Sequence, residues 1–103
     1  MGARALLVLA LASGVTPDAI AQQPDPVLGR NLAAACANCH GTGGASRGTM
    51  PSLAGRDRAE IARLMREFRS GQRPATVMHQ IAKGYSDDQV EAIAAYLSVQ
   101  KGK

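Results

Sequence analysis

The chain has 103 residues and a formal net charge of +4, so its length allows one small domain and excludes a multidomain enzyme. Apolar residues make up 46% of it and charged residues 19%, a balance that predicts a folded chain rather than a disordered tail. Only Phe68, Tyr85 and Tyr96 are aromatic. Because so small a chain buries a low share of its surface, we expect another component to supply core volume.

Residues 1–21 are predicted to be a cleaved secretory signal peptide. Arg4 precedes an apolar run at 5–12, and Ala19-Ile20-Ala21 places small residues at both recognition positions of a signal-peptidase site. A membrane anchor is the less favoured interpretation, because the run is too short to cross a bilayer of ~30 Å. We therefore expect a mature domain of residues 22–103, exported to a bacterial periplasm and without stable membrane insertion.

The first half of the mature chain predicts one helix and one long loop. Residues 27–39 carry apolar side chains at helical spacing, namely Leu28, Leu32, Ala35, Cys36 and Cys39. Residues 41–55 contain five glycines and Pro51, which predicts a loop.

The second half predicts three helices. Residues 56–70 place Ile61, Leu64, Met65 and Phe68 on one face, and Gly71 follows as a C-terminal cap. Pro74 stops an extension, so a shorter helix is expected over 75–83, ending at Gly84. Ser86-Asp87-Asp88-Gln89 forms a capping box before Val90, Ile93, Ala94 and Leu97. No strand-like alternation occurs, and the predicted fold is all-α, with four to five short helices.

The stretch Cys36-Ala37-Asn38-Cys39-His40 contains both cysteines of the chain. Two thiols at this spacing can each bond one vinyl group of a haem, and the following His can ligate the iron. A redox disulfide would leave His40 without a role, and a structural zinc site would have to recruit the distant His79 as fourth ligand. We therefore predict one covalent haem c, which would also fill the thin core.

A second axial ligand must come from Met50, Met65, Met78 or His79. Met65 lies on the apolar stripe of its helix, which favours core packing. Met50 stands next to Pro51, only ten residues after His40, and is expected to stay on the histidine side of the ring. Met78, 38 residues after His40, is the predicted ligand, and a thioether there raises the potential. Met78 as packing, and His79 or Met50 as ligand, remain alternatives.

The whole mature chain resembles the class I cytochromes c. The matching features are Gly29, Cys36 to His40, the run Pro51-Ser52-Leu53-Ala54-Gly55, Met78 and a terminal helix with Tyr96. The resemblance implies that Gly29 meets Tyr96 where the first and last helices cross. It also implies that the Pro51 carbonyl accepts a hydrogen bond from the proximal His40, which fixes the tautomer and raises ligand basicity. The chain departs from the family at Ala33, where an aromatic is common.

Residues 73–78 and 81–87 are similar to the monohaem cytochrome subunit of flavocytochrome c sulfide dehydrogenase and, less closely, to c4, c5 and c553 carriers. The first resemblance implies single-electron transfer from a flavoprotein subunit that oxidises sulfide. The alternative is a diffusible carrier between a dehydrogenase and an oxidase. No catalytic residue is expected, because Met78 would fill the iron position that a peroxidase-like enzyme keeps open.

Six arginines lie within residues 56–73: Arg56, Arg58, Arg63, Arg66, Arg69 and Arg73. They could steer the protein to an acidic partner, although a solvated helix face is the favoured interpretation. A nucleic-acid partner is not expected, because stacking aromatics are missing and the chain is predicted to be exported.

Overall fold

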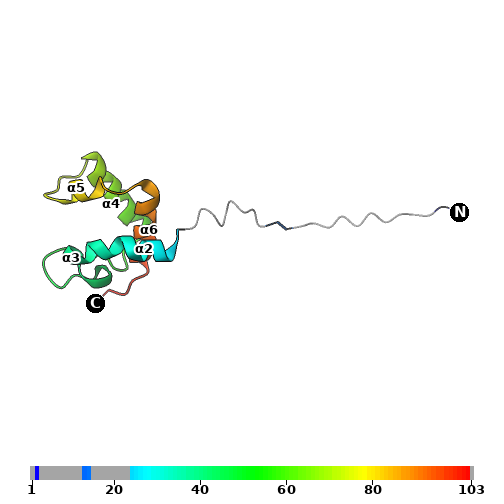
Figure 1. The fold of residues 1–103 in the computed structure, drawn as a ribbon, viewed down its shortest axis with the longest axis horizontal. Helices are drawn as coiled ribbons and strands as arrows, with labels where there is room; N and C mark the ends of the chain where they lie inside the picture. Colours follow the sequence, from blue (N-terminus) through cyan, green and yellow to red (C-terminus); the bar gives the residue numbers. More distant parts are fainter. Residues whose placement is uncertain (1, 3–12, 15–23, 103) are drawn as a thin grey trace.

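The computed structural model describes residues 2, 13–14 and 24–102, and its helical elements are shown in Figure 1. They are α2 (Pro26–Ala33), η1 (Ala34–Cys36), α3 (Ala37–His40), η2 (Thr42–Gly44), α4 (Arg58–Ser70), α5 (Met78–Ala82) and α6 (Asp87–Ser98). The described residues contain no strand, and the all-α prediction is confirmed. The predicted signal segment, 1–21, lies outside the described residues except at 2, 13 and 14. Within the described part of the chain, no helix has both the length and the apolar character needed to span a bilayer.

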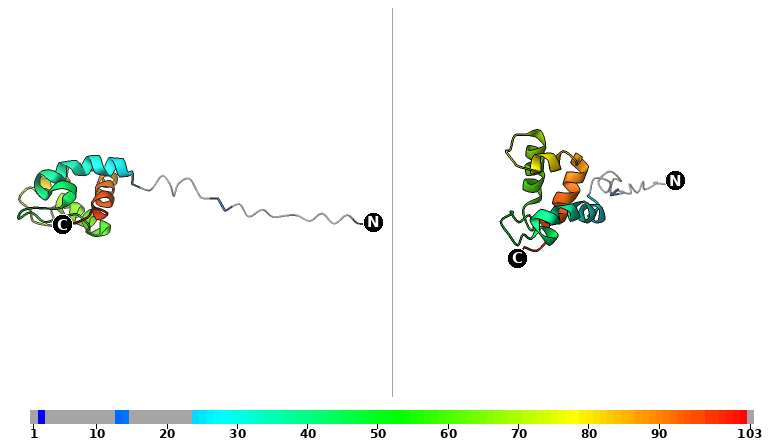
Figure 2. Two further views of the ribbon diagram at one scale, coloured as in Figure 1. Left: turned by 90° about the horizontal axis from the view of Figure 1, so that it is seen from below. Right: turned by 60° about the vertical axis from the view of Figure 1, so that its left-hand side comes forward.

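Helices α2 and α6 cross in close contact, as both views of Figure 2 show. A Cβ atom on Gly29 would lie 2.4 Å from the Ala92 carbonyl oxygen and 3.1 Å from the Tyr96 Cβ. Only a residue without a side chain allows the two backbones to approach this closely. The predicted meeting of Gly29 with the helix that carries Tyr96 is therefore confirmed.

The segment predicted as one helix over 27–39 instead changes type along its length. An α-helical part ends at Ala33, a 3-10 turn follows, and a short α-helix ends at His40. Gly29 and Ala33 are buried, whereas Leu28 is exposed. At Ala33, where an aromatic is common in the family, the small side chain belongs to the core cluster.

Helix α4 packs against α5 and α6 through the face predicted from the sequence. Ile61 and Met65 are buried, and Leu64 and Phe68 are half-buried. The helix begins two residues later than predicted, because Asp57 has extended backbone angles as its N-cap. Gly71 ends it in the left-handed conformation, at φ +83°, as predicted for a glycine cap.

Helix α5 is shorter than the predicted span of 75–83. Thr76 and Val77 form bends, and the helix starts only at Met78. Both residues are β-branched, which lowers helix propensity, and they follow Pro74 closely. Met78 therefore occupies the first position of a short helix.

The capping box of α6 is confirmed. The Gln89 amide donates to the Ser86 hydroxyl over 3.3 Å, and the Ser86 amide donates to the Gln89 side chain over 2.9 Å. This helix supplies the largest fully buried side chains among the described residues, Val90, Ile93 and Leu97. The core is therefore small and centred on α6.

Candidate functional site

A cavity of about 870 Å³, here called the wide lobe, opens beside α3 and α5. Its volume lies within the ~300–1,000 Å³ that ligand sites typically occupy. Residues that line this lobe alone include Ala35, Cys36, Cys39, Val77, Ile81 and Tyr85. The wide lobe is thus mainly apolar, with two thiols in its wall.

A second cavity of about 410 Å³, here called the narrow lobe, extends toward α4 and α6. The two lobes share five lining residues: His40, Met50, Pro51, Phe68 and Met78. Because five side chains belong to both linings, the two lobes adjoin, and together they are called the cleft. All five residues predicted for the site line the wide lobe: Cys36, Cys39, His40, Pro51 and Met78.

His40 ends α3 and is 8% exposed. Its Nδ1 lies 2.7 Å from the Pro51 carbonyl oxygen. Because a carbonyl oxygen only accepts hydrogen bonds, Nδ1 carries a proton, and in the neutral ring Nε2 then keeps its lone pair. The hydrogen bond inferred from the family resemblance is present, and it leaves the imidazole in the tautomer that can ligate a metal ion.

The loop that holds Pro51 is fixed at both ends. The Gly44 carbonyl accepts hydrogen bonds from the Leu53 and Ala54 amides over 2.7 and 3.1 Å, and the Gly55 amide donates to the Leu97 carbonyl over 3.0 Å. These bonds tie the loop to η2 and to α6. The Pro51 carbonyl therefore meets His40 from a braced backbone.

Both cysteines carry free thiols. Cys36 lies in η1 and is half-buried, whereas Cys39 lies in α3 and is exposed. Burial raises the pKa of the Cys36 thiol, so Cys36 is a neutral thiol at neutral pH. Two unoxidised sulfurs therefore stand at the wall of the wide lobe.

The four candidate axial residues occupy different places. Met78 packs partly buried against the core and lines both lobes. Met50 also lines both lobes, but it is 45% exposed. Met65 is buried in the core and reaches only the narrow lobe. His79 lines neither lobe, and its buried Nδ1 has no hydrogen-bond partner among the described residues.

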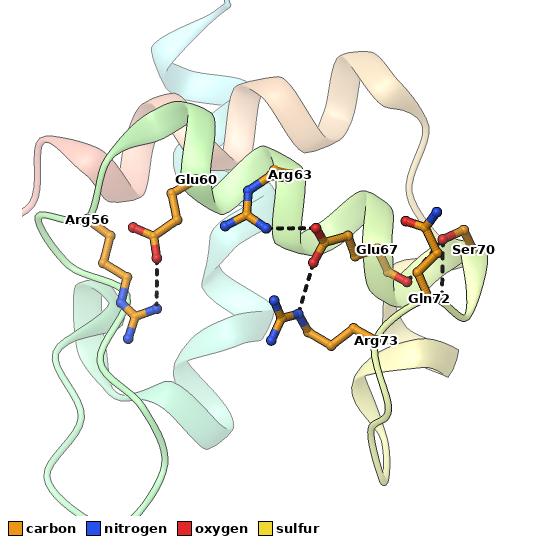
Figure 3. A network of polar contacts seen from close by, with 7 residues as sticks. All are labelled: Arg56, Glu60, Arg63, Glu67, Ser70, Gln72 and Arg73. Carbon is orange, nitrogen blue, oxygen red and sulfur yellow. Dashed lines mark hydrogen bonds and ion pairs between the residues drawn. The ribbon is translucent and has the colours of Figure 1, made fainter.

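The arginines of residues 56–73 are all paired with carboxylates, in part across helices. Arg58 and Arg66 both reach Glu91 on α6, and Arg69 pairs with Asp87. On the other side of α4, Arg56 pairs with Glu60, while Glu67 bridges Arg63 and Arg73 (Figure 3). The favoured interpretation, a solvated helix face, accounts for Arg58, Arg66 and Arg69.

Sequence reasoning missed that three of these arginines line the narrow lobe: Arg56, Arg63 and Arg73. The available signal was their position in the sequence, since Arg56 lies just before α4, Arg63 is adjacent to the half-buried Leu64, and Arg73 follows the glycine that ends α4. Without the cleft, these charges cannot be told from ordinary surface arginines.

The donor set fits a haem. The cleft is large and mainly apolar, its wall holds two free thiols, and both lobes meet an imidazole with a free Nε2 and a thioether. The described core contains few large buried side chains, so a flat apolar group would supply the missing volume. Imidazole and thioether are one axial ligand pair found in electron-transfer haems.

Comparison with known proteins gives the same result. Residues 28–97 match the family described as "Cytochrome C oxidase, cbb3-type, subunit III". The chain is 38% identical over 101 residues to the "Cytochrome subunit of sulfide dehydrogenase" of Chlorobaculum tepidum, covering 93% of this chain and 92% of that protein. It is 42% identical over 72 residues to the "Thiosulfate dehydrogenase electron acceptor" of Stutzerimonas stutzeri, covering 67% of this chain and 33% of that protein.

Among solved structures, reduced recombinant cytochrome c4 from Pseudomonas stutzeri superposes with a TM-score of 0.73 at 30% identity. The match covers 79% of this chain and 48% of that one, so this chain spans about half of the cytochrome c4 polypeptide. The chain therefore belongs to the cytochrome c family, as a class I c-type cytochrome that transfers electrons through a covalently bound haem c.

Proposed function

We propose that this chain is the electron-accepting haem subunit of a periplasmic sulfide dehydrogenase, and that its partner subunit is a flavoprotein. The observation that supports this assignment is the match to the Chlorobaculum tepidum subunit, which extends over 93% of this chain and 92% of the relative. The similarity runs along nearly the full length of both chains, so it is not confined to the attachment motif.

The residues of the cleft take the following roles in this proposal. Cys36 and Cys39 form the two thioether bonds, His40 is the proximal ligand through Nε2, and Met78 is the distal ligand. Pro51 holds His40 through the Nδ1 hydrogen bond of 2.7 Å, which fixes the ring orientation and raises the basicity of Nε2. When bound, the haem supplies single-electron chemistry by change of iron valence, and no acid, base or nucleophile is required of the chain.

Met78 is supported over Met50 by the chain path. Met50 directly precedes Pro51, whose carbonyl is hydrogen-bonded to His40, so the Met50 backbone is held near the proximal side. Met78 belongs to another element, α5, and is partly buried against the core. A ligand with a packed, fixed side chain excludes water from the iron better than one that is 45% exposed.

The mouth of the wide lobe offers an apolar contact surface to a partner. Val77 and Ile81 line it and are 54% and 39% exposed. Among the described residues, no Asp, Glu, Lys or Arg side chain lines this lobe. A neutral patch of this kind is typical of the central part of a protein interface, and it borders the lobe that both cysteines line.

The first test is purification of the mature protein from its own host under mild conditions. We expect haem and flavin absorbance to co-elute through successive columns, and sulfide to reduce the haem in that fraction. Haem alone, at the size of one chain, would contradict a permanent flavoprotein partner. Sequencing the purified chain from its N-terminus tests export, and the expected first residue is Gln22.

The second candidate is a diffusible electron carrier, which the cytochrome c4 similarity favours. Such a carrier forms small, transient interfaces and needs no stable subunit. The same purification separates the two candidates, because a carrier would leave the flavoprotein at the first column and would accept electrons from more than one dehydrogenase.

A further inference from the structure

The two lobes of the cleft differ in charge. Cys36 and Cys39 line only the wide lobe, whose lining contains no Asp, Glu, Lys or Arg. Arg56, Arg63 and Arg73 line only the narrow lobe. The cationic side chains therefore lie at one end of the cleft and the thiols at the other, with the shared walls between them.

A haem has the same polarity along its plane. Its vinyl groups, which react with the thiols, lie on one side of the ring, and its two propionate carboxylates lie on the opposite side. A haem held by its vinyl side in the wide lobe would direct its carboxylates toward the other end of the cleft, where the arginines line the narrow lobe. A carboxylate placed in an apolar cleft is costly unless it is paired and hydrogen-bonded.

Two of these arginines, Arg63 and Arg73, are paired with Glu67, as Figure 3 shows. Arg63 donates to one Glu67 oxygen over 2.7 Å, and Arg73 donates through Nε to the other over 3.0 Å. The Arg73 guanidinium also lies 6.0 Å from the centre of the Phe68 ring, and Phe68 lines both lobes. Both terminal nitrogens of Arg73 and one of Arg63 make no other hydrogen bond among the described residues, so they can donate to a further carboxylate.

The charge balance around the narrow lobe favours binding of a further carboxylate. Around the narrow lobe, three guanidinium groups face the carboxylates of Glu60 and Glu67. One positive charge is thus uncompensated before the haem enters, and the Arg56–Glu60 pair, at 3.7 Å, is longer than a good hydrogen bond. Terminal arginine nitrogens recognise carboxylates in bidentate geometry.

We propose that Arg63 and Arg73 bind the haem propionates at the narrow lobe, with Arg56 beside them and Glu67 as the residue that positions both arginines. This inference rests on the proposed roles of the cysteines and deepens them. It assigns the potential of the haem partly to Arg63 on α4 and to Arg73, and not only to the axial pair.

The test uses the intact haem-loaded protein and the variants Arg63→Gln and Arg73→Gln. Arg66→Gln is the matched control, because Arg66 lies on the same helix, pairs with Glu91 over 3.2 Å and lines neither lobe. Two quantities are measured at one pH and salt concentration: the midpoint potential, by optical redox titration, and the propionate bending frequency, by resonance Raman spectroscopy. Circular dichroism checks folding, which these exposed side chains should not disturb.

We expect both test variants to shift the propionate frequency and to lower the midpoint potential more than Arg66→Gln does, because removing a nearby positive charge stabilises the more positive ferric state. Arg73→Lys retains the positive charge but loses the paired guanidinium donors. It should therefore change the propionate bending frequency while lowering the midpoint potential less than Arg73→Gln does. If Arg63→Gln and Arg73→Gln match Arg66→Gln in both quantities, the proposal is wrong. That result leaves the cysteine roles intact, whereas a chain without covalent haem would overturn those roles instead.

Discussion

The two sides of this domain are built by different means. Where α2 crosses α6, the backbones meet so closely that Gly29 has no room for a Cβ, and protein atoms alone fill the space. On the cleft side, α3 and α5 are short, and exposed apolar residues such as Val77 and Ile81 surround a cavity of about 870 Å³. The helix crossing is packed by protein side chains and backbone alone, whereas the cleft side needs the haem to fill it.

This difference explains how so few aromatic residues can support a fold. Small residues allow close helix packing on one side, and a large apolar cofactor replaces side-chain volume on the other. We therefore expect loss of the haem to unfold the cleft side most, and a disturbed crossing of α2 and α6 to destabilise the whole domain.

The largest effect is expected from removing both attachment thiols. In Cys36→Ala/Cys39→Ala no covalent bond holds the haem, and we expect the haem to be lost from the cleft. Without the haem the apolar walls of the cleft face water, and this loss of apolar burial is expected to remove a large share of the ~5–15 kcal/mol that stabilises an ordinary domain. We expect much lower helicity and no cooperative melting transition by circular dichroism.

The control for that variant is Met50→Ala, which trims a half-exposed side chain of the cleft and keeps both thiols. It should retain covalent haem and a cooperative transition. A haem-free double variant with the helicity and melting transition of the natural protein would refute the dependence of the cleft side on its cofactor.

A smaller effect is expected at the crossing. Gly29→Val places side-chain atoms where a Cβ would already lie 2.4 Å from the Ala92 carbonyl oxygen. Overpacking of this kind typically costs ~1–3 kcal/mol, measured as the change in unfolding free energy by chemical denaturation. Gly48→Val is the matched control, because nothing lies within 4 Å of a Cβ at that position. Equal losses in the two variants would mean that the crossing is not tight.

The N-cap of α6 should contribute less. Ser86→Ala removes the acceptor of the Gln89 amide and is expected to lower the unfolding free energy by ~1 kcal/mol. Ser86→Asp, which keeps an acceptor at that position, should retain most of the stability. If Ser86→Asp loses as much as Ser86→Ala, the hydroxyl does not act as a cap.

The smallest effect is an acid dependence on the surface of α4. Hydrogen bonds from Arg63 and then Arg73 lower the pKa of Glu67 below its ordinary value of 4.5. Because the folded state holds the charged form, the stabilisation is present above pH 4.5 and is lost as the pH falls through the lowered folded-state pKa. Glu67→Gln should therefore be less stable than the natural protein at neutral pH, with the difference closing in acid. A difference that is constant with pH would contradict this ion-pair origin.

Much of this architecture follows from local sequence patterns. The apolar stripe of α4, the glycine after it and the capping box of α6 each depend on residues within a few positions of one another, and the structure confirms all three. The attachment motif is local too, and it predicts the cofactor that family membership supports. The Gly29 contact and the Pro51 hydrogen bond join distant segments, and they were inferred only through resemblance to a family.

What the sequence could not supply depends on tertiary placement. The start of α5 at Met78 reflects a balance among Pro74, Thr76 and Val77 that helix propensity alone does not resolve. Likewise, Arg66 and Arg73 are the same residue type seven positions apart, yet one pairs with α6 and the other lines the narrow lobe. Only the fold separates a surface ion pair from a residue of the cleft.

The most direct test of the site is the carbon monoxide response of the reduced protein. With His40 and Met78 filling both axial positions, the absorbance spectrum of the natural protein should not change when carbon monoxide is added. Met78→Ala should open one position and give a new spectrum with the gas, while Met50→Ala should behave like the natural protein. If Met50→Ala binds carbon monoxide and Met78→Ala does not, the axial assignment at the centre of this account is wrong.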